Sequence, residues 1–321
     1  MLTVVLVLLA LAAGFGLGAR AALQGGKKLH RKGGYPLLRD VVPIRVEPRT
    51  PGRLRFLALG DVGTGDADQA RVAATVRRLC EEQPQDFVVF LGDTFYEAGL
   101  SGPDDPLFER LFESQYGQLG VPCFGIAGNH DVKRDALPLV LCTLRSRTWR
   151  MPNFHYGFTV PPSAAGSTPI ARFFLLNTNL NLLELMRLRR ELQPDARLWT
   201  FVMGHHSLYA NGAEGDWDWP GRRYWHRHLG PFTDFYVSGH NHQLEHLRVT
   251  GLATDYVVSG AGGSHYRAHV ARGARFKRSR AESLFVYRDN GLAAFDVTAG
   301  RVRVSYLDAD GRQLHAFERT R

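Results

Sequence analysis

The sequence feature that most constrains the fold is a polar motif that directly follows a run of apolar residues. The run Phe87–Phe90 leads to Gly92, then to a carboxylate at Asp93 and a phenol at Tyr96. A short continuous apolar run that ends at a glycine is typical of a strand buried on both faces. A carboxylate at the end of such a strand is unfavourable unless a positive charge meets it. The sequence therefore indicates a cation beside Asp93.

The same arrangement, an apolar run followed by glycine and a polar side chain, occurs five times. Any single occurrence is most often an ordinary turn, or a histidine packed in the interior. Five unrelated turns are improbable, because each motif follows a buried-strand pattern and has glycine where the chain must turn tightly. The motifs are Gly60-Asp61-Val62-Gly63, Gly92-Asp93-Thr94-Phe95-Tyr96, Gly128-Asn129-His130-Asp131, Gly204-His205-His206 and Gly239-His240-Asn241-His242.

Apolar runs alternate with segments of helical spacing, which predicts a layered α/β fold. Each motif follows the carboxyl end of a strand, where open α/β sheets bind their ligands. Residues 132–168 show no regular pattern, and the tail from 284 to 307 predicts antiparallel hairpins with turns at 289–291 and 299–300. The expected strands are 54–59, 87–91, 121–127, 172–176, 198–203, 235–238 and 256–260, and the expected helices are 69–82, 107–116 and 180–192.

The motifs together offer oxygen and nitrogen donors that suit metal ions. Two carboxylates, an amide, three imidazoles and a phenol suffice for two ions about 3.5–4 Å apart that share one carboxylate, a pair that clamps phosphate and activates water. The phenol favours ferric iron, since few divalent-metal sites use tyrosinate. If residues 239–242 are extended, His240 and His242 point the same way, one toward each ion. The candidate ligands are Asp61, Asp93, Tyr96, Asn129, His205, His240 and His242.

This set of motifs resembles the calcineurin-like metallophosphoesterases over roughly residues 54–266. Tyr96, three positions after Asp93, makes the chain similar to the purple acid phosphatases, especially the small, tartrate-resistant acid phosphatase-like type. The strand and glycine turn at residues 256–262 also resemble that family. The resemblance implies a four-layer α/β/β/α sandwich, in which two mixed β-sheets are flanked by helices.

The resemblance also implies a role for each candidate residue. A hydroxide held by the metals would attack the phosphorus of a phosphate monoester. His130 directly follows Asn129, so it would lie beside the substrate and stabilise the transition state or protonate the leaving group. The ligands of Fe(3+) would be Asp61, Asp93, Tyr96 and His242, and those of the second ion, Fe(2+), Zn(2+) or Mn(2+), would be Asp93, Asn129, His205 and His240.

The chain departs from the family pattern at positions that face the substrate. Small animal members carry a second histidine a few residues after the fourth motif, where this chain has Glu214 and no histidine before His226. Glu214 is therefore a candidate substrate-side residue, and His206 is a second candidate that would otherwise support the ligands or lie at the surface. The family often has an aspartate where this chain has Asn177. None of these departures removes a candidate ligand.

Three functions remain compatible with these motifs. The leading one is a purple acid phosphatase-like enzyme that hydrolyses small phosphate monoesters. A second is a phosphodiesterase or pyrophosphohydrolase on the same scaffold, which Tyr96 disfavours because those relatives usually lack the tyrosine. A third is a membrane-tethered protein that binds metal or phosphate without turnover, which the intact ligand set disfavours.

The chain begins with a segment that differs from the rest. Residues 1–19 carry no charged side chain and are nearly long enough to cross a bilayer, which needs about 17 residues at least. Ala19-Arg20-Ala21 resembles a signal-peptide cleavage site. We therefore expect a signal peptide or membrane anchor at 1–23, a linker at 24–52 and the phosphoesterase domain at 53–321.

Two features of the chain point to different locations of the domain. Lysines and arginines at 27, 28, 31 and 32 would hold the downstream chain in the cytoplasm by the positive-inside rule. We expect export instead, to a periplasmic, secreted or membrane-anchored state, because the remaining chain resembles an exported enzyme. Contact with a membrane is expected only through the amino-terminal segment.

Charge and cysteine content exclude other classes. The formal net charge is +9, yet no Lys/Arg-rich helix is interleaved with aromatic residues, so no nucleic-acid partner is expected. The 3 cysteines are widely spaced, which argues against a disulfide framework or a thiolate zinc site. The aromatic residues at 217, 219, 224 and 225 are expected to form a loop that packs its own rings, with a substrate lid or membrane-facing rim as the alternatives. The basic run at 272–280 is expected to be solvated, with binding of phosphate ligands or of anionic lipid as the alternatives.

Overall fold

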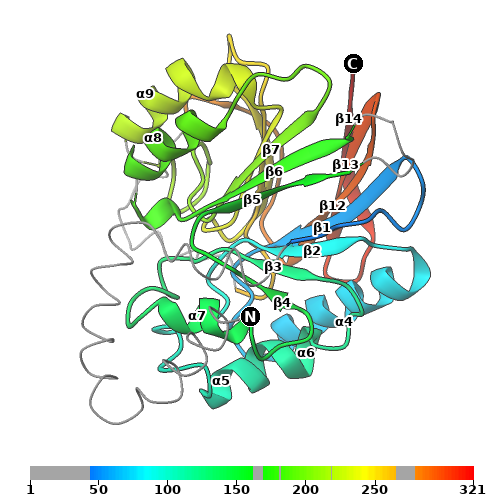
Figure 1. Cartoon of the computed structure of the whole chain (residues 1–321), viewed down its shortest axis with the longest axis vertical. Coiled ribbons are helices and arrows are strands. Elements are labelled where there is room, and N and C mark those ends of the chain that lie inside the picture. Colours follow the sequence, from blue (N-terminus) through cyan, green and yellow to red (C-terminus); the bar gives the residue numbers. More distant parts are fainter. Residues whose placement is uncertain (1–43, 162–168, 181, 218, 265–278) are drawn as a thin grey trace, which may run out of the picture.

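The computed structural model describes residues 44–161, 169–180, 182–217, 219–264 and 279–321. These residues form two seven-stranded mixed β-sheets that pack face to face, with helices on both outer faces (Figure 1). The four-layer α/β/β/α sandwich expected from the sequence is thereby confirmed.

The first sheet, sheet A, contains β1 (Arg53–Leu59), β2 (Phe87–Phe90), β3 (Cys123–Gly125), β4 (Trp149–Arg150), β12 (Gly291–Thr298), β13 (Arg301–Asp308) and β14 (Gln313–Thr320). Its strand order is β14-β13-β12-β1-β2-β3-β4. The strands β1 to β4 are parallel, whereas β12, β13 and β14 form an antiparallel extension. The parallel strands are nearly continuous apolar runs because both of their faces are covered.

The second sheet, sheet B, contains β5 (Tyr156–Val160), β6 (Ala171–Leu176), β7 (Trp199–Gly204), β8 (Phe235–Ser238), β9 (Leu244–Arg248), β10 (Asp255–Ser259) and β11 (Glu282–Tyr287). Its strand order is β11-β9-β10-β8-β7-β6-β5, and β6, β7, β8 and β10 are parallel. Both sheets therefore place the carboxyl ends of their central strands at one edge.

Helices cover each sheet on the side away from its partner. In Figure 1, α4, α5 and α6 lie below sheet A, and α8 and α9 lie beside sheet B. The helix α4 begins where the Asp66 carboxylate accepts hydrogen bonds from the backbone N–H groups of Asp68 and Gln69. The helices are α4 (Ala67–Glu82), α5 (Pro106–Phe108), a π-helix η1 (Glu109–Glu113), α6 (Ser114–Tyr116), α7 (Leu137–Cys142), α8 (Leu182–Glu191) and α9 (Trp219–His228), with 3-10 turns η2 (Thr178–Leu180) and η3 (Gly230–Phe232).

Stacked phenylalanine rings hold the two sheets together. The Phe56 ring stacks on Phe87 and Phe295 of its own sheet, with centroid distances of 4.8 and 4.4 Å. Its edge meets Phe173 and Phe201 of the facing sheet at 5.4 and 5.5 Å. Offset and edge-to-face contacts of this kind add about 0.5–1.5 kcal/mol each beyond the area they bury. This packing fixes the two sheets relative to one another.

Three expectations about local structure were wrong. Residues 132–168 were expected to be irregular, but they contain α7, β4 and β5. The aromatic segment near Trp225 is the helix α9 rather than a loop. The buried Trp225 side chain attaches this helix to sheet B, because its indole N–H donates a hydrogen bond to the hydroxyl of Tyr256 in β10. The turn at 289–291 does not close a hairpin: β11 pairs with β9 in sheet B, whereas β12 pairs with β1 in sheet A.

Several expectations concern residues that the structure does not describe. The segment expected to be a signal peptide or anchor, at 1–23, lies outside the described residues, as does most of the basic run at 272–280. Of the expected linker, residues 44–52 are described, and Val46 is buried in the core. Among the helices of the described ranges, none is sufficiently long and apolar to span a membrane.

Candidate metal centre

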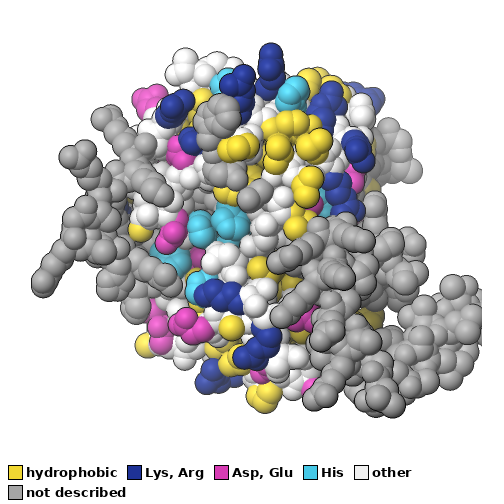
Figure 2. Space-filling model, turned by 90° about the vertical axis from the view of Figure 1, so that its left-hand side faces the viewer, with side chains coloured by type: hydrophobic (Ala, Val, Ile, Leu, Met, Phe, Trp, Pro, Cys, Tyr) yellow, Lys and Arg dark blue, Asp and Glu magenta, His cyan; other side chains and the backbone are white. Residues whose placement is uncertain are grey.

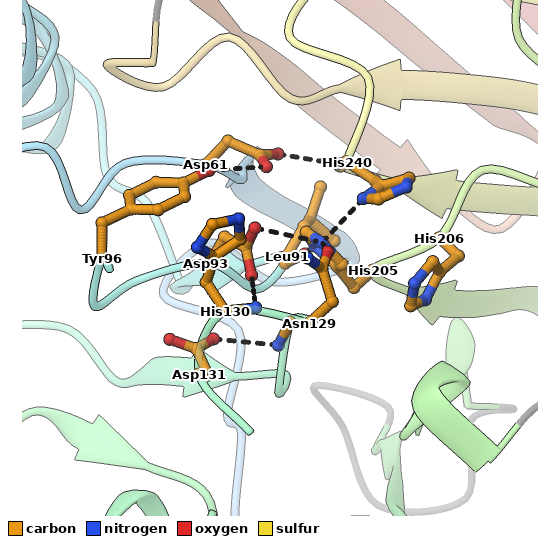
Figure 3. Close-up of polar contacts among 12 residues, drawn as sticks. Asp61, Leu91, Asp93, Tyr96, Asn129, His130, Asp131, His205, His206 and His240 are labelled. Carbon is orange, nitrogen blue, oxygen red and sulfur yellow. Dashed lines mark hydrogen bonds and ion pairs between the residues drawn. The ribbon is translucent and has the colours of Figure 1, made fainter. Parts of the chain in front are cut away.

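The five motif loops converge at the carboxyl ends of β1, β2, β3, β7 and β8 (Figure 3). Backbone hydrogen bonds join them directly. The Asp61 N–H donates to the Gly92 carbonyl at 2.9 Å, and the Gly239 N–H donates to the His205 carbonyl at 3.1 Å. The residues that the sequence placed in five separate turns therefore form one site.

The close approach of the loops requires glycine at two positions. A Cβ atom on Gly92 would lie 2.6 Å from Nδ1 of His205, and a Cβ atom on Gly128 would lie 2.1 Å from Oδ1 of Asp93. Both distances are shorter than nonbonded carbon contacts allow, so any side chain would displace a candidate ligand. The glycines that mark the motifs in the sequence are thus part of the site geometry.

Three candidate ligands have backbone conformations that non-glycine residues rarely adopt. The φ angles of Asp61, Asp93 and His240 are 59°, 51° and 68°, all in the left-handed region. Such conformations cost about 1–3 kcal/mol each and persist where the surrounding contacts enforce them. Their clustering here shows that the loops are held in place to present these side chains.

The first group of ligands surrounds the His205 imidazole. Its Nδ1–H donates to the Leu91 carbonyl at 2.9 Å, which leaves the lone pair of Nε2 directed into the site. Nε2 then faces Oδ1 of Asn129 at 2.9 Å, Nδ1 of His240 at 3.2 Å and Oδ2 of Asp93 at 3.5 Å. A backbone carbonyl that fixes the far ring nitrogen in this way is usual for a metal-bound histidine.

This first group requires a positive charge between its atoms. The carboxylate and amide oxygens accept hydrogen bonds, and the Nε2 lone pair would repel them. Burial opposes a charge on His205, but the Asp93 carboxylate outweighs it and raises the pKa of the imidazole to about 10. A proton therefore supplies the charge when no other cation does. A metal ion bound to Nε2, Oδ1 of Asn129 and Asp93 would supply it equally well.

The second group surrounds the Tyr96 phenol. Its hydroxyl oxygen lies 3.2 Å from Oδ1 of Asp61 and 3.4 Å from Nε2 of His242, and these two atoms lie 3.4 Å from one another. Burial, reinforced by the charges of Asp61 and Asp93, raises the pKa of the Tyr96 phenol far above its ordinary range. A phenolate can therefore exist here only beside a strong Lewis acid.

Asp61, Asp93 and His205 form the centre of both groups. Each is buried, and each offers a ligand atom within 4.8 Å of the others. Burial would raise the pKa of the Asp93 carboxyl, but the adjacent His205 imidazole lowers it well below its usual range. Two buried carboxylates beside an imidazole whose Nε2 proton a metal ion can replace are a fitting set of donors for metal ions. The candidate ligands that the sequence offers are thus brought together in space.

The segment that carries His240 and His242 is not an extended strand. Residues 239–242 bend, and His240 has a positive φ. The His240 N–H donates to Oδ2 of Asp61 at 2.7 Å, which stabilises this bend. The imidazole of His240 then points to His205, and that of His242 points to Tyr96. The expectation of one histidine for each group stands, although the backbone is not extended.

His130 is half-buried and lies beside Asp93 and Tyr96 (Figure 3). Its backbone N–H donates to Oδ1 of Asp93 at 2.8 Å, and its ring lies 4.6 Å from the Tyr96 ring. Nδ1 of His130 is 2.9 Å from the Glu97 carbonyl and 2.7 Å from Nζ of Lys133. His130 therefore borders the ligands without joining them.

The two tentative substrate-side residues occupy different environments. His206 is largely buried, 2.9 Å from the Thr178 hydroxyl and stacked on Trp217 at 6.0 Å between centroids. Burial, with the neighbouring His205 charge, lowers the pKa of His206 to about 3. The Glu214 side chain is exposed, and in the described part of the chain its carboxylate makes no hydrogen bond or ion pair. The loop that carries Glu214 is held by a hydrogen bond from the Glu214 backbone N–H to Oδ1 of Asn241, the residue between the candidate ligands His240 and His242.

Two further residues near the site, Asp131 and Lys133, were not predicted to have a role from the sequence. The buried Asp131 carboxylate accepts hydrogen bonds from the backbone N–H groups of Gly128 and Phe95, both at 2.9 Å, and so ties the second motif to the third. An acidic residue within a buried glycine motif is a signal for such a role. Lys133 lies beside His130, and no sequence pattern marks it.

Asn177 is linked through Asn179 to the backbone that precedes Asn129. Its side-chain oxygen accepts a hydrogen bond from the Asn179 amide at 3.0 Å, and the same amide donates to the Ala127 carbonyl at 3.0 Å. Asn177 itself is fully buried. It therefore positions the loop before Asn129, which explains why an amide can stand where the family often has a carboxylate.

Comparison of the sequence with known protein families identifies the family to which the chain belongs. The sequence profile described as Calcineurin-like phosphoesterase matches residues 54–244, which is more than half of the chain and includes all five motifs. The chain belongs to the calcineurin-like phosphoesterase family. The Asp61, Asp93 and His205 group of this family member is buried and preformed. The chain is thus a metal-dependent phosphoesterase, a hydrolase, as the sequence indicated.

Individual relatives indicate which members of the family this phosphoesterase resembles. It is 28% identical to purple acid phosphatase 3 of Arabidopsis thaliana over 298 residues, which cover 85% of this chain and 79% of the relative. It is 24% identical to human tartrate-resistant acid phosphatase type 5 over 317 residues, 85% of this chain and 93% of that one. The resemblance to small purple acid phosphatases is therefore confirmed.

A solved structure supports the fold. It is described as GAP50, the anchor in the inner membrane complex of Plasmodium, and it superposes with a TM-score of 0.67 at 19% sequence identity. The superposition covers 84% of this phosphoesterase and 89% of that chain. At this identity the likeness establishes the shared architecture alone.

Proposed function

We propose that this protein is a dinuclear-metal phosphatase that hydrolyses small phosphate monoesters. The observation that carries the proposal is the position of the Tyr96 hydroxyl, 3.2 Å from Asp61 and 3.4 Å from His242. Figure 3 shows Asp93 between this group and the group around His205. The site thus offers donors for two ions that share one carboxylate, as a phosphate clamp requires. The names of the curated relatives support the same activity.

The donor chemistry suggests a different metal for each group. The Tyr96 group, with Asp61, Asp93 and His242, suits Fe(3+), because a phenol whose pKa is raised this far needs a strong Lewis acid to ionise. The other group, with Asp93, Asn129, His205 and His240, suits Fe(2+), Zn(2+) or Mn(2+), whose preferred ligands are imidazole and oxygen. When bound, the metals would polarise the phosphate and lower the pKa of a water molecule.

The residues at the rim have complementary tasks. Lys133 would neutralise a phosphate dianion, which favours monoesters over singly charged diesters. Nδ1 of His130 cannot donate to the Glu97 carbonyl and accept from Lys133 at the same time. When phosphate draws Lys133 away, the Glu97 carbonyl would hold Nδ1–H, and a His130 imidazolium would pass its second proton from Nε2 to the leaving group.

Two other functions remain to be separated by experiment. A phosphodiesterase or pyrophosphohydrolase would use the same donors, and an anchoring protein would keep the fold without turnover. The anchoring function is considered because the solved structure that is described as an anchor has the same fold. The complete and preformed donor set favours catalysis over anchoring.

A paired assay tests the proposal. Pure protein of known metal content is given p-nitrophenyl phosphate and bis(p-nitrophenyl) phosphate, with Asp93→Asn as the control for contaminating phosphatase. We expect about two metals per chain and much faster hydrolysis of the monoester. Preference for the diester would make the protein a phosphodiesterase. Two bound metals with no turnover of either substrate would support the anchoring function.

A further inference from the structure

Away from the metal centre, the structure contains a pocket of about 480 Å³ beside α9. In Figure 2, lysine and arginine side chains gather in the upper part of the face that carries α8 and α9. Among the described side chains that line the pocket, none is acidic. The polar and aromatic lining residues are Tyr209, Arg222, Arg223, His226, Arg227 and Arg280.

The sequence spacing on α9 concentrates its arginines and His226 on one side of the helix. Arg223 and Arg227 are four positions apart, and so are Arg222 and His226, so each pair projects from the same face. Arg280 adds a further positive charge from outside the helix. Like charges at this spacing destabilise an isolated helix by a few tenths of a kcal/mol per pair. An anion in the pocket would remove this repulsion.

An acidic side chain compensates part of this charge. Arg222 forms an ion pair with Asp216 and lies 6.0 Å from the Tyr209 ring centroid. Nevertheless, its buried Nε has no hydrogen-bond partner in the described part of the chain. Within the same ranges, Arg227 and Arg280 make no ion pair. The exposed guanidinium groups of Arg227 and Arg280 are therefore the donors that the pocket offers to a ligand, beside the Tyr209 ring.

We propose that this pocket is a second anion-binding site, separate from the metal centre, that binds a phosphoryl group. Guanidinium groups match the oxygen atoms of phosphate in geometry and bind them through paired, charge-assisted hydrogen bonds. Several arginines around one cavity suit a dianion or a ligand with two phosphates. The phosphoryl group belongs either to a soluble ligand or to a lipid headgroup.

The test counts bound ligand by isothermal titration calorimetry with methylenebisphosphonate, whose P–C–P bridge resists hydrolysis. The metal-loaded protein is compared with Arg223→Gln/Arg227→Gln and with Arg280→Gln, which leaves the helix unchanged. The matched control is Arg110→Gln/Arg147→Gln, which removes the same charge at exposed positions far from α9. We expect each pocket variant to bind about one equivalent less than wild type at equal metal content, and the control to bind as wild type does.

A second arm identifies the source of the phosphate. Cosedimentation is measured with phosphatidylcholine vesicles that contain phosphatidate, and with phosphatidylcholine alone. Vesicle binding that needs phosphatidate, Arg223 and Arg227 assigns the pocket to a lipid headgroup, whereas a calorimetric loss alone assigns it to a soluble phosphate. The proposal is wrong if neither signal depends on Arg223, Arg227 and Arg280, or if the control variant loses as much. Loss of the equivalent bound at the metals would bear on the proposed phosphatase activity alone.

Discussion

The Nε2 atom of His205 lies 2.9 Å from Oδ1 of Asn129, although 76 positions separate the two residues in the chain. A neutral imidazole whose Nδ1–H is bound to the Leu91 carbonyl has only a lone pair to offer at Nε2. The short distance therefore places two electron-rich atoms together. A proton on Nε2, which the raised pKa of His205 supplies, or a metal ion in its place resolves the conflict, and this need for a cation is the physical basis proposed for the metal centre.

Replacing the shared carboxylate tests that basis. Asp93→Asn keeps the shape of the side chain but removes the negative charge between the two ligand groups. We expect less than two metals per chain and loss of phosphatase activity, because removing one partner of a buried charge pair costs about 3–5 kcal/mol. Metal analysis and an assay with p-nitrophenyl phosphate measure both effects. Wild-type turnover with both metals retained would show that Asp93 is not shared.

The close approach of the loops makes a purely steric prediction. In Gly128→Ala the new Cβ would meet Oδ1 of Asp93 at 2.1 Å, so the carboxylate must shift. We expect weaker metal binding and at least a tenfold loss of activity in a folded protein. Gly102→Ala is the control, since a Cβ there has no heavy atom within 4 Å. Equal metal affinity in the two variants would contradict the geometry described for Gly128.

Substitution of His130 distinguishes a role in the chemical step from a role in metal binding. His130→Ala should keep both metals and the fold, and lower kcat by roughly 10²–10⁴, the usual contribution of a positioned acid. The loss should be smaller for p-nitrophenyl phosphate than for alkyl phosphates, because p-nitrophenolate leaves without a proton. Glu214→Ala is the companion variant, and it should steepen the same dependence only if its carboxylate donates a proton. An equal loss on every leaving group would exclude His130 as the proton donor.

A buried histidine away from the site makes stability depend on pH. Nδ1 of His155 lies 2.5 Å from Glu184 and Nε2 lies 3.1 Å from Glu191. Burial opposes the charged imidazole, but the two carboxylates outweigh it and raise the pKa of His155. A raised pKa in the folded state gives stability that is fully present below the unfolded pKa of about 6.5. That stability is lost as pH rises through the folded value.

The corresponding experiment follows the free energy of unfolding between pH 5.5 and 9 by urea denaturation. Stability of the wild type should fall across the folded pKa of His155, above about 6.5. His155→Gln should lack this fall, and at low pH it should be less stable by about 3–5 kcal/mol, because Glu184 is left buried and unpaired. The exposed His226→Gln should follow the wild type. A pH profile unchanged by His155→Gln would contradict the assignment.

Buried parallel strands explain how much could be predicted from the sequence. The strands β2, β7 and β8 are buried throughout and mostly apolar, β1 becomes so from Phe56 onward, and a glycine ends or soon follows each strand. Since parallel strands end at the same edge, the order of apolar runs and glycines is enough to place the motifs that follow them in one site. The layered α/β fold and the convergence of the candidate ligands follow from these patterns, whereas the sandwich of two sheets was expected from the resemblance to the phosphoesterase family.

What could not be predicted depends on distant contacts. The bend at residues 239–242 is stabilised by a hydrogen bond from His240 to Asp61, 179 positions earlier, which no local pattern indicates. The helix α9 has a polar, arginine-rich sequence after Trp219-Pro220-Gly221, which suggests a turn, although proline is well tolerated at the start of a helix. Lys133 faces His130 only because the loop after Asp131 folds back, and a lone lysine carries no pattern of its own.

The most direct test of the central claim is the visible spectrum of the metal-loaded protein beside that of Tyr96→Phe, with metals counted in both. Phenylalanine fills nearly the same space but has no oxygen to donate, so only the bond to the metal is lost. We expect the wild type to contain about two metals per chain, one of them iron, with a visible absorption band that Tyr96→Phe abolishes. A colourless, active wild type that holds only zinc or manganese, or a band that survives in Tyr96→Phe, would contradict the ferric tyrosinate centre.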